Sequence, residues 1–334
     1  MLILVEGVPG AGKSSTARQL RDALEAAGRP VRWWSEEELR HPVHIFQDDA
    51  GLKQCVADLR QGHFETVIQS ALERWQRFAD GQRESETTGI LDGCLSIYLT
   101  YTLMFFDVPE STIAAYIDQV VRIIAPCDPR LVLLRPADLA RNLASVCTAR
   151  GQGWVQAHIG RTETSLLGQR LGLHGFEGFV AFWAEHEALT DRLFGEIPFP
   201  KTVAPGPVED AATTRRILRD FLSIDVQTAE TSGPELARFA GWYAEQSSGP
   251  AATYEVVCEH DVVVIIGLPG FGDRCRLVRR GPCSFALESF PSGATFSLDE
   301  QGTPQVMTLA GSDLLFGRSG APRLFRRVAD GPLR

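Results

Sequence analysis

Near its N-terminus the chain reads Gly7-Val8-Pro9-Gly10-Ala11-Gly12-Lys13-Ser14. This stretch fits the pattern of a glycine, four residues, a second glycine, a lysine and a serine or threonine. Such glycines let backbone N–H groups curl around phosphate oxygens, and the start of a following helix adds a favourable dipole. Lys13 would supply a cation to the terminal phosphates, and the Ser14 hydroxyl is a suitable ligand for Mg²⁺. The stretch therefore predicts a phosphate-binding loop.

The residues on either side of the loop give it the expected setting. Leu2 to Glu6 is a short apolar run typical of a buried strand, and Ser14 to Ala27 carries apolar residues at helical spacing. Strand, loop and helix in this order satisfy the structural context of the motif. Further strand and helix patterns alternate as far as Leu222, which predicts a parallel sheet wrapped by helices. The other predicted strands are Val31–Trp34, Gly89–Asp92, Leu131–Leu134 and Lys201–Ala204, and the other predicted helices are Phe64–Phe78, Ile113–Ile124, Asp138–Arg150, Gly178–Phe194 and Val208–Leu222.

The pattern changes after about Asp225. Residues 226–234 are rich in threonine, serine and glycine, and beyond them short apolar or alternating runs are separated by glycine, proline and aspartate. We expect an α/β domain at 1–225, a linker at 226–234 and a small β-barrel or β-sandwich domain at 235–334. Its predicted strands are Tyr254–Cys258, Val262–Gly267, Arg274–Val278, Phe285–Ser289, Thr295–Leu298, Gln305–Leu309 and Arg323–Val328.

Composition narrows the class of protein. The formal net charge is −9 at pH 7, which disfavours a nucleic-acid partner because polyanion binding needs a basic surface. No apolar run reaches the roughly 18 residues that span a bilayer, and Met1 leads straight into a strand pattern. We therefore expect a cytoplasmic protein with no membrane partner. The seven cysteines stand singly and are predicted to be reduced, and His41 and His44 have no metal-ligand partner that the sequence identifies.

The loop and its setting resemble the P-loop kinases, which comprise nucleoside, nucleotide and small-molecule kinases. The resemblance covers about residues 1–224 and implies a three-layer αβα sheet with strand order 2-3-1-4-5. It also implies ATP and Mg²⁺ as cofactors. The nucleotide-binding residues would then be Pro9, Gly10, Ala11, Gly12, Lys13, Ser14 and Ser15. A GTPase is a weaker interpretation because the chain has no Asn-Lys-x-Asp motif.

Carboxylates follow two of the predicted strands. Asp92 closes a strand expected beside the loop, and ligands bind at this carboxyl edge of parallel sheets. The resemblance implies that Asp92 holds Mg²⁺ or accepts the proton of the attacking hydroxyl; alternatively it only begins a turn before Gly93. Glu36 and Glu37, after the second strand, are rival bases. The same acidic run is also typical of the solvated first turn of a helix.

A lid is expected over Thr148 to Glu163, where Gly151, Gly153 and Gly160 would serve as hinges. The resemblance implies lid arginines that contact the transferred phosphate, since a guanidinium pairs well with phosphate oxygens. Arg150 is the first choice for a catalytic role, and Arg141 is predicted to contact the nucleotide. Arg161 is a third candidate. Each of these arginines is equally compatible with an ordinary surface position. The resemblance also implies that the loop Ala204-Pro205-Gly206-Pro207 touches the adenine.

The C-terminal part carries a second resemblance. The stretch Leu236 to Tyr243 is similar to the opening of lipocalin-like β-barrels appended to some serine hydrolases of the β-lactamase class. The likeness spans about residues 233–328 and brings no catalytic residues. Such a barrel would cover an acceptor site, bind an apolar group or support a homodimer.

The sequence favours an ATP-dependent phosphotransferase that acts on a small organic acceptor such as a nucleoside, sugar or antibiotic. In this hypothesis Lys13, Asp92, Arg150 and Glu36 carry catalysis, and Ser14 and Asp92 hold the metal. The alternative is a nucleotide-dependent regulatory ATPase whose β domain binds a partner. Phosphorylation of polynucleotide ends is a third possibility, which the acidic charge disfavours.

Overall fold

The computed structural model describes residues 1–46, 48–207, 209–224, 234–246, 252–259, 262–268, 271–313 and 321–329. Contacts define two compact units, the first within Met1–Thr148 and Gln152–Gln227 and the second within Ala149–Gly151 and Thr228–Arg334. Of the predicted linker, only Pro234 falls within the described ranges. Val208, the expected start of the last helix of the first unit, lies outside them.

Five parallel strands form the sheet of the first unit, in the order β2-β3-β1-β4-β5. This is the order that the family resemblance implied, and each strand forms where the apolar runs predicted one. A parallel strand covered on both faces needs a continuous apolar run, which β1 and β4 provide, whereas the edge strands β2 and β5 are only partly buried. The strands are β1 (Leu2–Glu6), β2 (Val31–Trp34), β3 (Thr88–Asp92), β4 (Pro129–Leu134) and β5 (Lys201–Ala204).

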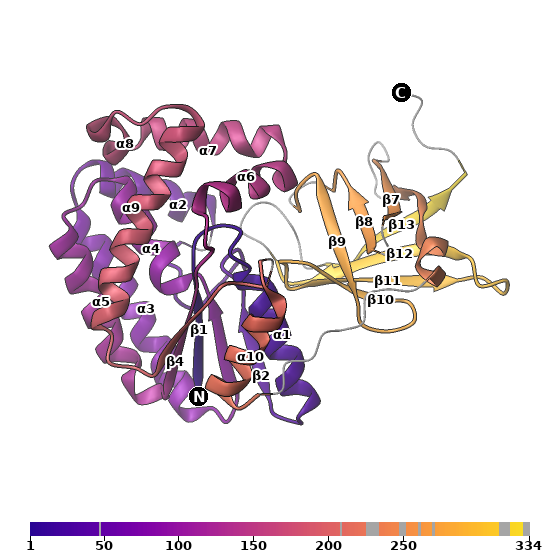
Figure 1. The fold of residues 1–334 in the computed structure, drawn as a ribbon, viewed down its shortest axis with the longest axis horizontal. Coiled ribbons are helices and arrows are strands. Elements are labelled where there is room, and N and C mark those ends of the chain that lie inside the picture. Colours follow the sequence, from indigo (N-terminus) through magenta and orange to yellow (C-terminus); the bar gives the residue numbers. More distant parts are fainter. Residues whose placement is uncertain are drawn as a thin grey trace. The chain divides into compact units, whose positions relative to one another are not determined.

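Helices cover both faces of this sheet, which makes three layers (Figure 1). The central strand shows the division, because successive side chains of a strand point to opposite faces. Leu2 and Leu4 belong to one hydrophobic core, whereas Ile3 and Val5 belong to another. The first core contains residues of α3 (Phe64–Glu84) and α5 (Glu110–Ile124), and the second contains residues of α1 (Lys13–Ala26) and α10 (Ala211–Leu222).

The periodicity also predicted α6 (Leu139–Arg150) and α9 (Gly175–Glu196). It did not predict several shorter helices, which the sequence marks only weakly. Isolated short helices are marginal, and tertiary packing provides most of their stability. These are α2 (Asp49–Arg60), η1 (Cys94–Tyr98), α4 (Leu99–Phe105), η2 (Ala125–Cys127), α7 (Gln152–Thr164) and α8 (Leu166–Leu171).

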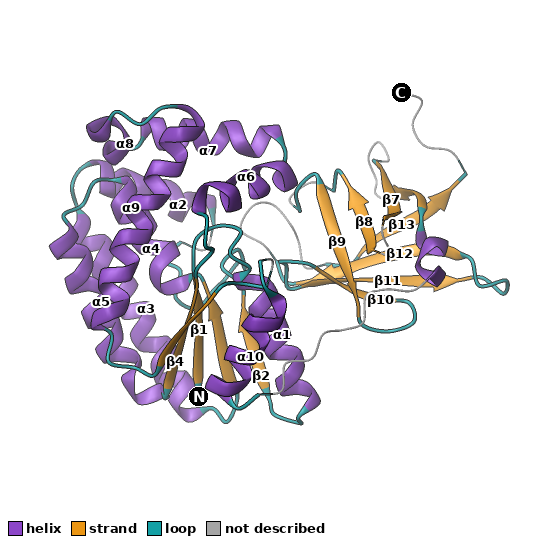
Figure 2. Cartoon of the chain, viewed as in Figure 1, coloured by secondary structure: helices purple, strands orange, loops and turns teal. Residues whose placement is uncertain are grey.

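The second unit consists mainly of antiparallel strands (Figure 2). Eight strands close into a barrel because β13 pairs with β6, and the expectation of a small all-β domain is confirmed in its barrel form. The short helix η3 (Pro234–Phe239) precedes the first strand, β6, which the sequence did not predict as a strand. The strands are β6 (Gly241–Glu245), β7 (Thr253–Glu259), β8 (Val262–Ile266), β9 (Arg274–Arg279), β10 (Ser284–Leu287), β11 (Ser292–Leu298), β12 (Pro304–Gly311) and β13 (Arg323–Val328).

Side chains fill the interior of the barrel. An eight-stranded barrel is just wide enough for side chains to occupy its centre. Here Phe239, Tyr243, Phe285, Phe296 and Phe325 are all buried, and several of their rings meet edge to face. The Tyr243 hydroxyl donates to the carbonyl oxygen of Phe239 over 3.0 Å, so the one polar atom of this group is satisfied. The barrel therefore has a hydrophobic core of its own.

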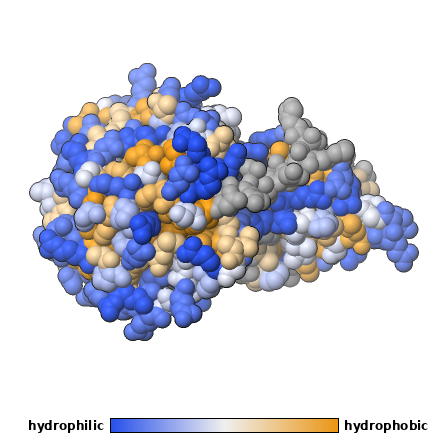
Figure 3. Space-filling view, turned by 60° about the horizontal axis from the view of Figure 1, so that its bottom comes forward, coloured by the Kyte–Doolittle hydropathy of each residue, from blue (hydrophilic) through white to orange (hydrophobic). Residues whose placement is uncertain are grey.

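The surface is mixed in character. Figure 3 shows hydrophilic residues surrounding smaller hydrophobic areas on one face. Large hydrophobic side chains exposed among the described residues are Leu166, Leu171, Phe176, Val203 and Leu324. Scattered residues of this kind are normal at protein surfaces. In the parts of the chain that the structure describes, no helix is both long and apolar enough to cross a membrane.

A buried hydrogen bond links α3 to α5. The Trp75 indole N–H donates to the Tyr116 hydroxyl over 3.0 Å, and both side chains are almost fully buried. Tyr116→Phe leaves the indole donor unsatisfied, which we expect to cost about 1–3 kcal/mol of unfolding free energy. Urea unfolding followed by tryptophan fluorescence measures this loss, because Trp242 alone of the six tryptophans lies in the second unit.

The double variant Trp75→Phe with Tyr116→Phe is the control. Since it removes both partners, its loss should be smaller than the sum of the two single losses. Additive losses would show that the hydrogen bond does not contribute.

Candidate functional site

The loop between β1 and α1 has the curled conformation that its sequence predicted. The Ala11 N–H donates to the Val8 carbonyl over 3.2 Å, and α1 begins at Lys13. Gly12 has a φ of 92° and leads into the helix. A Cβ added there would lie 2.6 Å from Cδ of Pro207, so a glycine is required by the backbone and by the space. The predicted binding residues from Pro9 to Ser15 therefore lie together at the start of α1.

Lys13 is buried, and its ammonium group lies among oxygen atoms. Its Nζ is 3.4 Å from Oε2 of Glu36 and 3.5 Å from the carbonyl oxygen of Val8. A buried cation needs such partners because leaving water is costly. Glu36 thus neutralises the cation that the motif provides for phosphates.

Asp92 lies beside this ion pair. The parallel pairing of β1 with β3 sets Asp92 opposite Val5, directly before the loop. The Glu36 N–H donates to Oδ1 of Asp92 over 2.8 Å. Gly93 follows with a φ of 65°, and a Cβ added there would lie 2.1 Å from Oε2 of Glu36. Glycine at this position lets the Glu36 carboxylate pack against the chain, which brings Lys13, Glu36 and Asp92 into one site.

Burial controls the electrostatics of this site. Asp92 is fully buried. Burial, together with the charge of Glu36, raises its pKa to about 7, although the Ser14 side chain and the charge of Lys13 oppose the shift. The carboxyl group of Asp92 is therefore poised between its two protonation states near neutral pH.

Sequence reasoning missed Glu6 at the end of β1. Burial raises the pKa of this carboxyl group, and hydrogen bonds from Ser96 and Leu95 oppose the rise. The Glu6 carboxylate accepts the backbone N–H groups of Leu95 and Ser96 over 2.9 and 3.0 Å and the Ser96 hydroxyl over 2.6 Å. Glu6 thereby anchors the turn that follows Asp92. The available signal was an acidic residue inside an otherwise apolar strand.

The acidic run after β2 does not begin a helix. Residues 36–37 form a turn, in which the Glu38 N–H donates to the Ser35 carbonyl over 2.9 Å. Glu38 pairs with Arg32, so the interpretation as a solvated first helical turn is wrong. The physical reason is that carboxylates of this acidic run form ion pairs with residues elsewhere in the fold, Glu36 with Lys13 and Glu38 with Arg32, and do not lie at the start of a helix.

A cavity of about 450 Å³ lies next to the loop. Gly10, Ala11, Arg141 and Pro205 are among the residues that line it. The Asn142 side-chain amide also lines it and donates to the Pro9 carbonyl over 2.7 Å, which ties α6 to the loop. Small-molecule sites commonly have volumes of 300–1,000 Å³. The predicted nucleotide contacts of Arg141 and of the loop after β5 are consistent with this position, although they stay predictions.

The expected lid is helical over most of its length. Gly160 lies inside α7, where the hydrogen bonds of the helix leave no hinge, and Gly153 belongs to the first turn of the same helix; Gly151 separates α6 from α7. Arg161 lies within α7. Arg150 is the last residue of α6, and its catalytic role stays a prediction.

Cys94 corrects the interpretation of the two histidines after β2. The sequence identified no metal-ligand partner for His41 and His44, yet Sγ of Cys94 lies 3.3 Å from Nε2 of His41. The three residues lie together because β2 and β3 are neighbours in the sheet. A spacing of more than fifty residues hid this contact from the sequence.

Comparison with known protein families supports the phosphate-binding loop in the N-terminal part of the chain. Residues 1–74 match the family model described as "Chromatin associated protein KTI12", a P-loop NTPase-like family. The first unit has the P-loop NTPase fold. The match includes the phosphate-binding loop and Glu36 but stops before Asp92. No curated protein matches the chain. Loop, fold and family match together support nucleotide binding.

Asp92 should make stability depend on pH in the magnesium-free and nucleotide-free protein. Its pKa rises from 3.8 to about 7 on folding, so the folded state holds a proton that the unfolded state releases between these values. Stability contributed by this group therefore falls as pH rises through that window. Asp92→Asn mimics the protonated form and removes the loss. We therefore expect the melting temperature of the variant minus that of the unmodified protein to increase as the pH rises from 3.8 to about 7.

The control for this experiment is Asp80→Asn, at an exposed position on α3. Thermal melts of both variants over the same pH series give the comparison. A pH-independent effect of Asp92→Asn would contradict the raised pKa.

Proposed function

We propose that this chain is an ATP-dependent phosphotransferase that moves the γ-phosphate of ATP to a hydroxyl of a small organic acceptor. The observation that carries the proposal is the convergence of Glu36 and Asp92 on Lys13 at the phosphate-binding loop. Phosphoryl transfer needs a metal ligand and a group that accepts a proton, and these two carboxylates can supply both.

The loop provides the phosphate contacts. Backbone N–H groups between Pro9 and Ser15 would bind the phosphate oxygens, with Lys13 as their counter-charge. Ser14 and Asp92 fit Mg²⁺, because they present hard oxygen donors, and Ser14 lies near enough to lower the pKa of Asp92. When bound, Mg²⁺ would screen the charge of the phosphates. The cavity beside Arg141 and Pro205 would receive the nucleoside.

The two carboxylates differ in solvent exposure, and we assign them different roles. Asp92 is fully buried, whereas the Glu36 side chain is 28% exposed. An acceptor can therefore reach Glu36 more readily. In the proposed step the Glu36 carboxylate takes the proton of the acceptor hydroxyl, the acceptor oxygen bonds to the γ-phosphorus, and the bond from that phosphorus to the bridging oxygen breaks to release ADP. Asp92 positions Glu36 by accepting its backbone N–H.

A regulatory ATPase is the second candidate. It is favoured by the match of residues 1–74 to a family described as chromatin associated, a description that names an assembly and no metabolic substrate. In that case the barrel unit would bind a partner, and ATP hydrolysis would reset the interaction. The net charge of −9 argues against a nucleic-acid substrate in either case.

Substitutions at the site test the proposed roles. We expect Lys13→Ala to abolish binding of MgATP, measured by calorimetry, because the counter-charge for the phosphates is lost. Glu36→Gln should retain nucleotide binding and lower the transfer rate by about 10²–10⁴-fold, since the proton acceptor is lost. Glu37→Gln is the matched control and should keep most of the activity. Equal losses in the Glu36 and Glu37 variants would refute the assignment of the base.

The products distinguish the two candidate functions. Incubation with γ-labelled ATP and a panel of nucleosides, sugars and antibiotics should give an acceptor-dependent labelled product. A regulatory ATPase would release only inorganic phosphate, at a rate that no panel member changes. This second outcome, in a protein that binds ATP, would reject the phosphotransferase proposal.

A further inference from the structure

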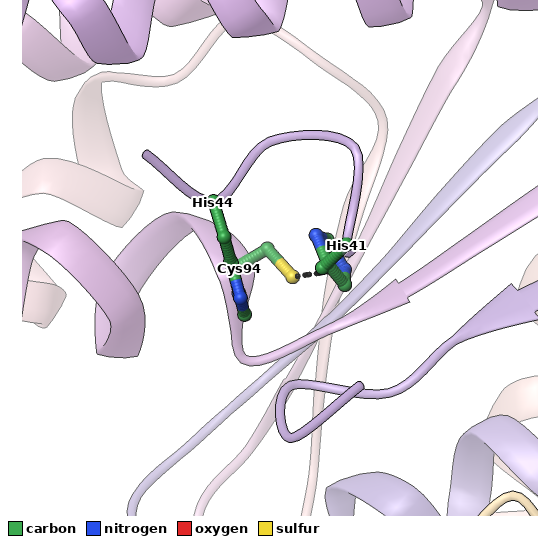
Figure 4. Close-up of side chains that lie close together, drawn as sticks. All are labelled: His41, His44 and Cys94. Atoms are coloured by element: carbon green, nitrogen blue, oxygen red, sulfur yellow. Dashed lines mark hydrogen bonds between the residues drawn. The ribbon is translucent and has the colours of Figure 1, made fainter. Parts of the chain in front are cut away.

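Two histidines and a cysteine form a buried cluster outside the phosphate-binding loop. His41, His44 and Cys94 are all fully buried. Their ligand-type atoms lie within 4.8 Å of one another. Figure 4 shows that His41 and His44 come from one loop and Cys94 from the turn after a neighbouring strand. The side-chain types match those that bind zinc in proteins.

Hydrogen bonds anchor the segments that carry these side chains. The Val43 N–H donates to Nδ1 of His41 over 3.3 Å. Zinc bound at Nε2 would displace this hydrogen bond, because the neutral imidazole would then carry its proton on Nδ1. Sγ of Cys94 is 3.3 Å from Nε2 of His41 and also 3.3 Å from the carbonyl oxygen of Asp92. Glu6 anchors the turn just after Cys94 through Leu95 and Ser96. The backbone of the cluster is therefore anchored, whereas the two imidazole rings must turn to share an ion.

The donor atoms of the cluster indicate which metal it suits. A thiolate with two imidazoles is a donor set that selects zinc over Mg²⁺.

The surrounding charges also accommodate a cation. Zinc bound through a thiolate adds one net positive charge, because the thiol proton leaves for solvent as the bond between zinc and sulfur forms. Three carboxyl groups interact electrostatically with the Cys94 thiol, namely those of Glu6, Asp92 and Glu36, and the positive charge of Lys13 opposes them. On the side of the histidines, the charge of Arg32 interacts with His41, although Arg32 is paired with Glu38, and the charge of Arg74 interacts with His44. Carboxylates thus predominate on the side of the thiol.

We propose that His41, His44 and Cys94 bind one zinc ion. The rings of His41 and His44 are stacked with centroids 4.1 Å apart and planes at 20°. Since the lone pair of an imidazole nitrogen lies in the ring plane, both rings turn edge-on when they share the ion. The terminal torsion of histidine is intrinsically broad. The turn nevertheless gives up the stacking of His44 on Tyr98, whose ring centroids lie 3.8 Å apart, so the bonds to zinc must outweigh this loss.

The ion would fasten two segments that carry the candidate site. His41 and His44 belong to the loop that begins with Glu36, and Cys94 follows Asp92 by two residues. Zinc would therefore restrain the positions of both carboxylates. The site itself does not depend on the proposed reaction, because metal content is measured without any acceptor.

Metal analysis of the full chain, purified without a histidine tag from zinc-supplemented culture, tests the proposal. We expect about one zinc per chain, as for a site of defined ligands. Cys94→Ser should lower zinc affinity by about 100-fold or more, and the matched control Cys147→Ser, on α6, should keep the ion. With cobalt in place of zinc, the unmodified protein and the control should show absorption from thiolate-to-cobalt charge transfer.

Far-UV circular dichroism checks that the Cys94 variant folds, and His44→Asn is a second variant should it not. The cobalt spectrum of the unmodified protein can exclude the site without any substitution, because this absorption requires a thiolate ligand; its loss in the Cys94 variant alone, among the seven cysteines, identifies Cys94. Absence of the absorption, or zinc content unchanged by Cys94→Ser, would overturn the proposal.

Discussion

The parallel pairing of β1 with β3 places Val5 opposite Asp92, and the other features of the site follow from that register. β1 is buried on both faces by two separate cores, so it cannot shift by a residue without exchanging those faces. Both strands end at the same edge of the sheet. At this edge the phosphate-binding loop follows β1, and the turn that contains Cys94 follows β3. Glu6 joins the ends of the two strands by accepting the backbone N–H groups of Leu95 and Ser96.

The site that results contains more buried negative than positive charge. Glu6 and Asp92 are buried carboxyl groups, and Lys13 is the buried cation between β1 and the turn after β2. Because burial penalises the ionised form, the pKa values of both carboxyl groups rise. A polyphosphate tail would add further negative charge, which Lys13 alone does not balance. If a nucleotide binds as we propose, this imbalance is a physical reason to expect a divalent cation with it.

Much of the architecture was predictable because its signals are local. The loop motif, the apolar runs of the five sheet strands and the strands β7 to β13 all depend on residues close together in the chain. The short helices α2, α4 and α8 were not predictable, because their stability comes from packing against distant residues. In the site, Lys13, Glu36 and Asp92 were each chosen as candidates from the sequence, and the structure places them together. Glu6 was missed although an acidic residue in an apolar strand was a local signal, whereas nothing in the local sequence of Cys94 distinguishes it from a core residue.

The sequence by itself determined the phosphate-binding loop, the alternation that makes a parallel sheet and the change to β-structure near residue 225. Periodicity and motif spacing carry this information, since they follow from backbone geometry over a few residues. Only the tertiary structure decided that Glu36 faces Lys13, that Asp92 is fully buried, and that His41 and His44 meet Cys94. These contacts join residues more than twenty positions apart, and they arise from the lateral order of strands, which no local pattern encodes.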